Sequence, residues 1–137
     1  MSVAATILRA VQRLAVMLAL GLLVPAAAGA VVKPRTVTAY CSRSGDVCYS
    51  VVDVDGKAVL QITTAARYFK RYTLCVRAPG RAARCGTYPV FRLAGSVWTS
   101  NVRFAKQFRY VGEGTYRATW KAGGHRLGPT LSFRLPL

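Results

Sequence analysis

Acidic residues are scarce in this chain of 137 residues, which has four of them against 20 lysines and arginines. Four carboxylates are too few to suggest the ligand cluster of a calcium site or the paired carboxylates of a glycosidase. Histidine is scarcer still, because His125 is the only one, and a histidine-centred enzyme would have to rest on it. These shortages leave little ground for an enzyme or a metalloprotein. The four acidic residues are Asp46, Asp53, Asp55 and Glu113.

Long apolar runs are missing beyond residue 30, so no membrane-spanning segment is expected in the body of the chain. The first thirty residues are different, with a basic, acid-free start, an apolar run over Leu14–Val24 and small residues up to Ala30. This order is typical of a secretory signal peptide, and the run is about half of the roughly 20 residues that a membrane span needs. We therefore predict a signal peptide over residues 1–30, cleaved after Ala30, and an exported protein.

The four cysteines all lie in residues 31–137, which the length and the lack of repeats or linkers predict to be a single domain. An even cysteine count in a short exported chain indicates disulfides, and three pairings are open. We favour Cys41–Cys48 and Cys75–Cys85, because each pair brackets a turn-like stretch and opposite residues of a hairpin have Cβ atoms about 4.5–5.5 Å apart. The spacings lack the C-x-x-C pattern of zinc sites, so no zinc is expected.

Strand signals fill this domain, and none of its segments shows a sustained helical period. Asp55-Gly56 between two apolar runs predicts a hairpin, because a type I′ turn needs positive φ at both central residues. Pro89 cannot donate to a sheet ladder, which predicts an edge or bulged strand. Residues 64–70 are ambiguous between one helical turn and a crossing between sheets. The expected strands are Thr36–Ser42, Val47–Val54, Lys57–Thr63, Tyr72–Arg77, Arg84–Leu93, Trp98–Phe104, Thr115–Lys121 and Leu131–Leu135.

Short strands with turn signals roughly every 8–12 residues indicate an all-β domain, either a sandwich or a small barrel. The last third carries a resemblance that favours the sandwich. Its segments are G-T-Y-R-A-T-W at Gly114–Trp120, G-G-H-R-L-G at Gly123–Gly128 and L-S-F-R-L at Leu131–Leu135. Together they resemble the closing hairpin of immunoglobulin-like β-sandwiches. The resemblance implies an immunoglobulin-like sandwich of about seven antiparallel strands, which the two local disulfides would staple.

Among exported bacterial proteins, this hairpin is most similar to the end of the CopC copper-resistance family. That family ends with a G-T-Y-x-x-x-W strand, a D-G-H turn and an F-x-V strand, and its copper ligands are a histidine at the mature N-terminus and the aspartate and histidine of the turn. Here Val31 and Gly123 stand at two of those positions and only His125 remains, so the resemblance implies the fold without the copper site. Residues 75–120 are also similar to small, arginine-rich secreted proteins of actinobacteria, which implies no activity.

The remaining candidates for chemistry each have a simpler interpretation. His125 lies in a predicted turn beside Arg126 with no neighbouring carboxylate or thiol, so we expect a solvated histidine. The segment from Asp53 to Gly56 begins like a calcium loop but lacks the later oxygen ligands and the distal glutamate. No serine lies in G-x-S-x-G, and four paired cysteines leave no nucleophilic thiol. We expect no catalytic centre, no cofactor and no bound metal.

The basic surface is the one positive signal for function. A formal net charge of +16 creates a long-range field that attracts polyanions, and arginine forks can hold phosphate or carboxylate with two hydrogen bonds. Aromatic residues are interleaved with the basic ones, and the alternative is a generic solvated surface over an aromatic core. The densest basic cluster, our candidate anion-binding site, is Arg67, Lys70, Arg71, Arg77, Arg81 and Arg84.

We therefore predict a secreted, non-enzymatic β-sandwich whose basic surface binds anionic envelope or extracellular material, either an anionic polymer or a membrane surface. Export argues against nucleic acid as a specific target, although charge alone predicts weak, salt-sensitive binding. Two alternatives stay open, namely metal handling on a CopC-like scaffold and a protein-binding or inhibitor module. Such a module would use the stapled loops Ser42–Val47 and Val76–Arg84, and its protein partner is unknown.

Overall fold

The computed structural model describes residue 29 and residues 33–137. The chain divides into two units, Met1–Val31 and Val32–Leu137, and every strand and helix reported below belongs to the second unit. The predicted signal peptide and its cleavage after Ala30 fall almost entirely outside the described residues. Within those residues, no helix has the length and apolar character that crossing a membrane would require.

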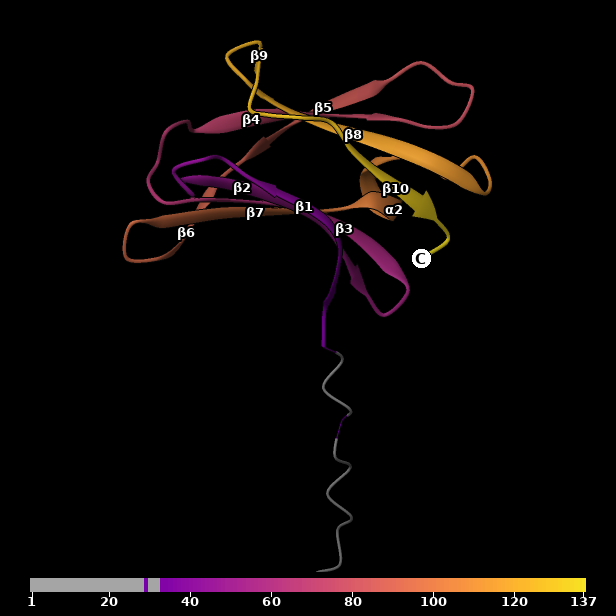
Figure 1. Ribbon diagram of the computed structural model, residues 1–137, viewed down its shortest axis with the longest axis horizontal. Helices are drawn as coiled ribbons and strands as arrows, with labels where there is room; N and C mark the ends of the chain where they lie inside the picture. The colour runs from indigo at the N-terminus through magenta and orange to yellow at the C-terminus, as the bar shows by residue number, and fades with distance from the viewer. Residues whose placement is uncertain (1–28, 30–32) are drawn as a thin grey trace, which may run out of the picture. The chain divides into compact units, whose positions relative to one another are not determined.

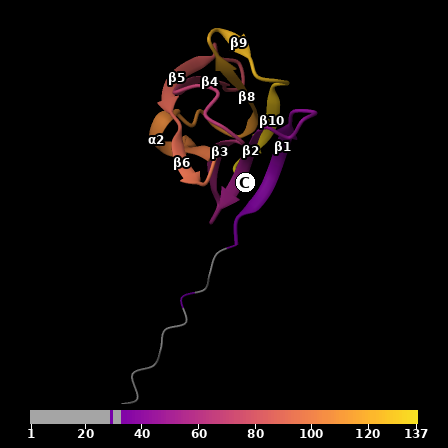
Figure 2. The same ribbon diagram turned by 90° about the vertical axis from the view of Figure 1, so that its left-hand side faces the viewer.

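Residues 33–137 form two antiparallel β-sheets that lie one above the other in Figure 1 and enclose the core in the end-on view of Figure 2. The first sheet has the strand order β1-β2-β3-β7-β6, and the second has the order β10-β8-β4-β5 with β9 paired to β8. A short helix, α2 (Phe104–Gln107), follows β7. The strands are β1 (Arg35–Cys41), β2 (Val47–Val54), β3 (Lys57–Thr64), β4 (Arg71–Arg77), β5 (Arg84–Pro89), β6 (Phe91–Ala94), β7 (Val97–Arg103), β8 (Gly114–Ala122), β9 (His125–Arg126) and β10 (Leu131–Leu135).

The core forms where the two sheets face each other. A strand turns successive side chains to opposite faces, and Leu60 and Ile62 of β3 are accordingly buried with half-buried residues between them. From the second sheet, the fully buried indole of Trp120 stacks on the ring of Tyr49, with centroids 4.5 Å apart. The Tyr49 hydroxyl donates to the Pro129 carbonyl at 2.6 Å. This aromatic pair therefore joins the sheets at their centre.

The prediction of an all-β domain with antiparallel strands is confirmed. Asp55 and Gly56 have φ values of 58° and 73°, the positive values that the predicted type I′ turn needs. Residues 64–70 carry the chain from the first sheet to the second, so they form the crossing rather than a helical turn. Pro89 lies in β5, which is an edge strand of the second sheet, as its missing donor predicts.

The prediction of one strand over Arg84–Leu93 is wrong, because the structure divides this segment into β5 in the second sheet and β6 in the first. The break falls at Val90, whose side chain is buried and whose N–H donates to the Lys70 carbonyl at 3.2 Å. Pro89 ends the ladder of β5 because it has no N–H, and the chain then crosses between sheets. With β9 also added, the expected number of about seven strands is too low, and Phe104 begins α2 instead of ending a strand.

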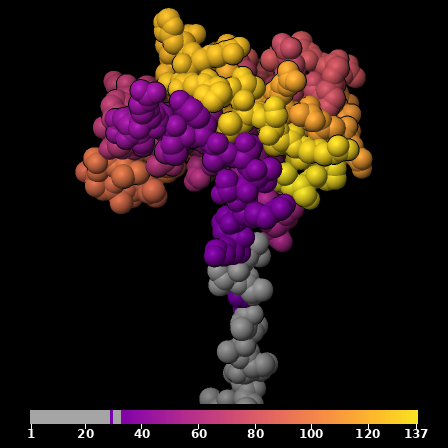
Figure 3. All heavy atoms as spheres, in the orientation of Figure 1, coloured from indigo at the N-terminus to yellow at the C-terminus, as the bar shows by residue number. Residues whose placement is uncertain are grey.

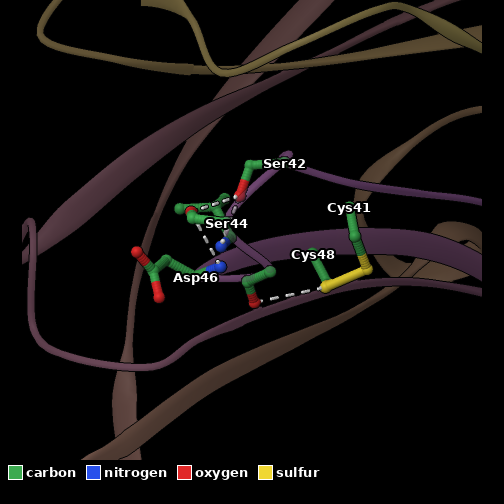
Figure 4. Close-up of a disulfide and its surroundings, with 7 residues drawn as sticks. Cys41, Ser42, Ser44, Asp46 and Cys48 are labelled. Carbon is green, nitrogen blue, oxygen red and sulfur yellow. Dashed lines mark hydrogen bonds between the residues drawn. A yellow bond between two sulfur atoms is a disulfide. The ribbon is translucent and has the colours of Figure 1, made fainter.

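Two disulfides, Cys41–Cys48 and Cys75–Cys85, join residues that lie opposite each other in the strand register, which confirms the favoured pairing. The Cα atoms are 4.1 Å apart in the first pair and 4.0 Å apart in the second. Each disulfide ties an edge strand to its inner neighbour, β1 to β2 in the first sheet and β5 to β4 in the second. Figure 4 shows the first disulfide beside the serine-containing turn that it closes.

The beginning and the end of the domain meet along one edge. β1 of the first sheet lies beside β10 of the second, as the indigo and yellow segments show in Figure 1 and Figure 3. Gly128, in the link between β9 and β10, sits so close to Tyr40 and Tyr49 that an added Cβ would lie 2.5 Å from each ring system. This close fit holds the link that leads from β9 into β10.

Alkaline pH is expected to destabilise the domain through Tyr72, whose burial raises its pKa to about 12. The unfolded tyrosine has a pKa of about 10, so its contribution to stability is complete below pH about 10 and is lost as pH rises through about 12. Denaturant unfolding across this range measures the loss. Tyr72→Phe removes the titrating hydroxyl, with its 3.1 Å hydrogen bond to Ser100, and we expect a shallower decline. Equal declines in the two proteins would contradict the assignment to Tyr72.

Candidate anion-binding site

The outer face of the second sheet carries the candidate site. In β8, Ala118 and Trp120 are buried in the core, so Arg117, Thr119 and Lys121 point to the opposite face. β10 shows the same alternation, and β4 shows it except at the disulfide-bonded Cys75, which is buried like its neighbours Leu74 and Val76. Three adjacent strands therefore present one polar and basic surface away from the core.

Strand register sets basic residues directly opposite each other on this face. Arg77 of β4 is the register partner of Arg117 in β8, and Arg126 of β9 is the partner of Lys121 in β8. Side chains at such positions have Cβ atoms about 4.5–5.5 Å apart, and like charges there are destabilising. The fold thus holds two pairs of cations at short range, an arrangement that a bound anion would stabilise.

A groove of about 540 Å³ runs between these pairs, and we call it the cationic groove. Its floor is polar, because the hydroxyl groups of Thr119 and Thr130 are hydrogen-bonded at 2.8 Å and the Cys75–Cys85 disulfide lies beside them. Hydroxyl groups can donate to an anion without adding charge. The cationic groove is lined by Cys75, Arg77, Ala83, Cys85, Arg117, Thr119, Lys121, Arg126, Thr130 and Ser132.

No carboxylate lines the cationic groove. Among the described residues the only ion pair is Arg35–Asp53, at 3.0 Å, and it joins β1 to β2 in the other sheet. Arg77, Arg117 and Arg126 are exposed to solvent. Their guanidinium groups are therefore available to phosphate, sulfate or carboxylate oxygens, which arginine binds through two parallel hydrogen bonds.

The basic cluster predicted from the sequence does not form one patch. Arg77 lines the cationic groove, whereas Arg71 lies at the other end of β4, roughly 20 Å away at a rise of about 3.3 Å per residue. Lys70 directly precedes β4, next to Arg71. The Arg67 guanidinium lies 4.7 Å from the ring centroid of Trp98, which belongs to the first sheet.

The last two predicted residues, Arg81 and Arg84, line a different hollow at the end of the molecule, described below. Sequence reasoning missed three members of the cationic groove, Arg117, Lys121 and Arg126. Alternation along β8 would have placed the first two on one outer face, and the Gly123-Gly124 turn would have placed Arg126 opposite Lys121. The pairing of β8 with β4, which brings in Arg77, has no local sequence signal.

The residues considered for metal binding lie at two hairpin turns, His125 beside Arg126 in β9 and Asp53 at the turn between β2 and β3. His125 is exposed in β9, and residues 33–137 contain no group of three or more His, Cys, Asp or Glu side chains placed to hold a metal ion. Asp53 accepts hydrogen bonds from the Gly56 N–H at 2.8 Å and from the Arg35 guanidinium at 3.0 Å. Asp53 therefore anchors the hairpin turn and β1.

Comparison of the chain with known protein families, with curated proteins and with solved structures gives no match. The geometry and chemistry of the chain itself must therefore carry the functional argument.

Proposed function

We propose that this protein is an exported, non-enzymatic binding protein that holds an anionic polymer of the cell envelope or extracellular material in the cationic groove. The observation that carries the proposal is that two like-charged pairs, Arg77–Arg117 and Lys121–Arg126, lie opposite each other in the strand register beside a groove that no carboxylate lines. Each pair costs stability in the free protein. An anion that bridges a pair would remove that cost and gain charge-assisted hydrogen bonds.

The spacing of the two cation pairs supports a polymer over a small anion. Arg117 and Lys121 are four residues apart on β8, a separation of roughly 13 Å at about 3.3 Å per residue. A small anion reaches one pair, whereas a chain of phosphate or carboxylate groups reaches both. Thr119 lies between the pairs on β8, and of the two hydrogen-bonded hydroxyl groups of Thr119 and Thr130 the one that accepts keeps its proton free to donate to an intervening oxygen.

We infer an immunoglobulin-like sandwich with β1 as an additional edge strand. The orders β2-β3-β7-β6 and β10-β8-β4-β5 support this inference, because they match the A-B-E-D and G-F-C arrangement of that fold with β5 added beside C, at the position of strand C′. Tyr116 adds support, since its hydroxyl donates to the Gly112 carbonyl at 2.8 Å and accepts from the Val111 N–H at 3.1 Å. This is the geometry of a tyrosine corner, in which a tyrosine near the start of a strand binds the backbone just upstream.

Export through a cleaved signal peptide over residues 1–30 belongs to the same proposal. Two disulfides support it, because structural disulfides persist in oxidising compartments outside the cytosol. Outside the cytosol, the available polyanions are envelope and matrix polymers and the headgroups of anionic lipids. The mostly polar lining of the cationic groove favours a polymer over the apolar tail of a lipid.

Binding of long-chain polyphosphate across a salt series tests the proposed function. Four basic contacts predict that the logarithm of affinity falls with the logarithm of salt concentration with a slope of about 3, at about 0.7–0.9 per contact. We expect triphosphate to bind much more weakly than the long chain, because it cannot reach both cation pairs. Isothermal titration calorimetry measures both affinities. Absent binding at low salt, or equal affinity for the two lengths, would contradict the proposal.

A further inference from the structure

A second hollow, of about 680 Å³, opens at one end of the sandwich, where α2 and residues 108–111 face the turn between β4 and β5. Its inner wall is aromatic. Phe104, Phe108 and Tyr116 lie beneath it, almost fully buried, and the ring of Phe104 meets that of Tyr116 edge-on with centroids 5.4 Å apart. Tyr110 stacks beside Tyr116 and is half exposed, so apolar surface extends from the core to the opening. We call this hollow the end pocket.

Three arginines surround the aromatic wall of the end pocket. Arg81 and Arg84 come from the hairpin of β4 and β5, and Arg109 comes from the segment after α2. All three are exposed, no acidic residue lines the pocket, and none of the three has an ion-pair partner among the described residues. The end pocket therefore combines an apolar interior with a positively charged rim.

Both walls of the end pocket are held in place before any ligand arrives. The tyrosine corner pins Val111 and Gly112 to the Tyr116 hydroxyl. On the other wall, Pro79 packs so closely on Gly114 that a Cβ at that glycine would lie 2.7 Å from the proline ring. Preformed pockets of about 300–1,000 Å³ with an apolar lining and a few polar groups are typical of small-molecule sites.

We propose that the end pocket binds an amphipathic organic anion, an acyl chain with one carboxylate or phosphate head. The chain would lie against the exposed side chains of Tyr110 and Val111, above the buried rings of Phe104 and Phe108. The head would be held by Arg81, Arg84 and Arg109. A polar polymer would bury none of the apolar surface of the end pocket, and an uncharged lipid would make no charge-assisted hydrogen bonds with the arginines. The end pocket shares no lining residue with the cationic groove, so this site goes beyond the proposed function.

Titration with decanoate, with decanol and butyrate as matched probes, tests the proposal. Decanoate is expected to bind and to shift the amide resonances of Val111 and Gly112. Decanol lacks the charge and butyrate lacks most of the chain, so each is expected to bind about tenfold more weakly or worse. Equal affinities for decanoate and decanol, or for decanoate and butyrate, would overturn the proposal, as would shifts confined to residues outside the end pocket.

Paired variants separate this site from the cationic groove. Arg81→Gln with Arg109→Gln is expected to lower decanoate affinity about tenfold or more and to leave decanol and polyphosphate binding unchanged. Arg77→Gln with Arg117→Gln is expected to lower polyphosphate affinity and to leave the binding of decanoate and decanol unchanged. Tyr110 is half exposed, so Tyr110→Ala should fold and should weaken decanoate and decanol alike. Unchanged decanoate binding in the Arg81 and Arg109 variant would overturn the proposal, whatever happens to polyphosphate.

A fatty acid in solution and a phospholipid in a membrane both present the proposed chemistry, and one comparison distinguishes them. Decyl phosphate carries the same chain as decanoate with a phosphate head, so the two free molecules should compete for the end pocket. Sedimentation with phosphatidylglycerol vesicles measures the membrane form. Vesicle binding that the Arg81 and Arg109 variant loses would identify a membrane lipid as the source of the head, and vesicle binding that it retains would leave the free acid as the ligand.

Discussion

Glutamine at all four basic positions of the cationic groove, Arg77, Arg117, Lys121 and Arg126, is expected to lower the affinity for long-chain polyphosphate about a thousandfold at low salt. A basic side chain beside an anionic surface contributes about 1 kcal/mol to the free energy of binding. Four such contributions total about 4 kcal/mol, and every 1.4 kcal/mol or so is a factor of ten. Calorimetric titration of wild type and variant measures the difference. The same variant is expected to unfold at an equal or higher denaturant concentration, because two like-charged pairs disappear.

A matched variant distinguishes the cationic groove from net charge alone. The control neutralises four of the exposed basic residues that line neither the cationic groove nor the end pocket, which removes the same total charge. If the cationic groove is the site and both variants are compared at about 0.1 M salt, this control should lose less than about tenfold in affinity, because long-range attraction is then largely screened beyond about 10 Å. Similar losses in the two variants would show that charge alone drives binding. The control residues are Arg43, Lys57, Arg103 and Lys106.

The substitution Trp120→Ala is expected to lower the free energy of unfolding by about 3–5 kcal/mol, the usual effect of truncating a buried tryptophan. Trp120 is fully buried at the centre of the sandwich, pairs with Leu74 in the strand register and stacks on Tyr49. Its removal leaves a cavity that both sheets border. A domain of this size is stabilised by about 5–15 kcal/mol, so the variant should be close to unfolding. Denaturant unfolding measures the change.

Trp120→Phe is the control for this effect. The Nε1–H of Trp120 has no hydrogen-bond partner among the described residues, so phenylalanine gives up no hydrogen bond within the protein. It keeps an aromatic ring against Tyr49 and leaves a smaller cavity, and we expect about half or less of the loss seen with alanine. A loss in Trp120→Phe equal to that in Trp120→Ala would contradict the expectation that an aromatic ring packed against Tyr49 stabilises the core.

Local features of the fold could be predicted from the sequence because their causes are local. The Asp55-Gly56 turn depends on two residues that tolerate positive φ, and each disulfide closes a short segment between adjacent strands. The break at Val90 was harder to predict, because both halves of the segment have strand character. Pro89 limits the ladder of β5, but the crossing to β6 is evident only from the burial of Val90 and its hydrogen bond to Lys70.

The candidate site was only partly predictable, because nearness in sequence is not nearness along a strand. The predicted cluster contains Arg71 and Arg77, which an extended strand separates by roughly 20 Å. Conversely, Arg77 and Arg117 are far apart in the chain and become neighbours through the pairing of β4 with β8. Alternation along a strand predicts which face a side chain occupies, but it does not say which strand lies beside it.

The most direct test of the central claim is an amide chemical-shift map of the wild-type protein titrated with long-chain polyphosphate. If the cationic groove is the binding site, the largest shifts will fall on Arg77, Arg117, Thr119, Lys121 and Arg126, at the outer faces of β4, β8 and β9. Shifts that centre on Arg67, Lys70 and Arg71, or that spread evenly over the basic residues, would contradict the account.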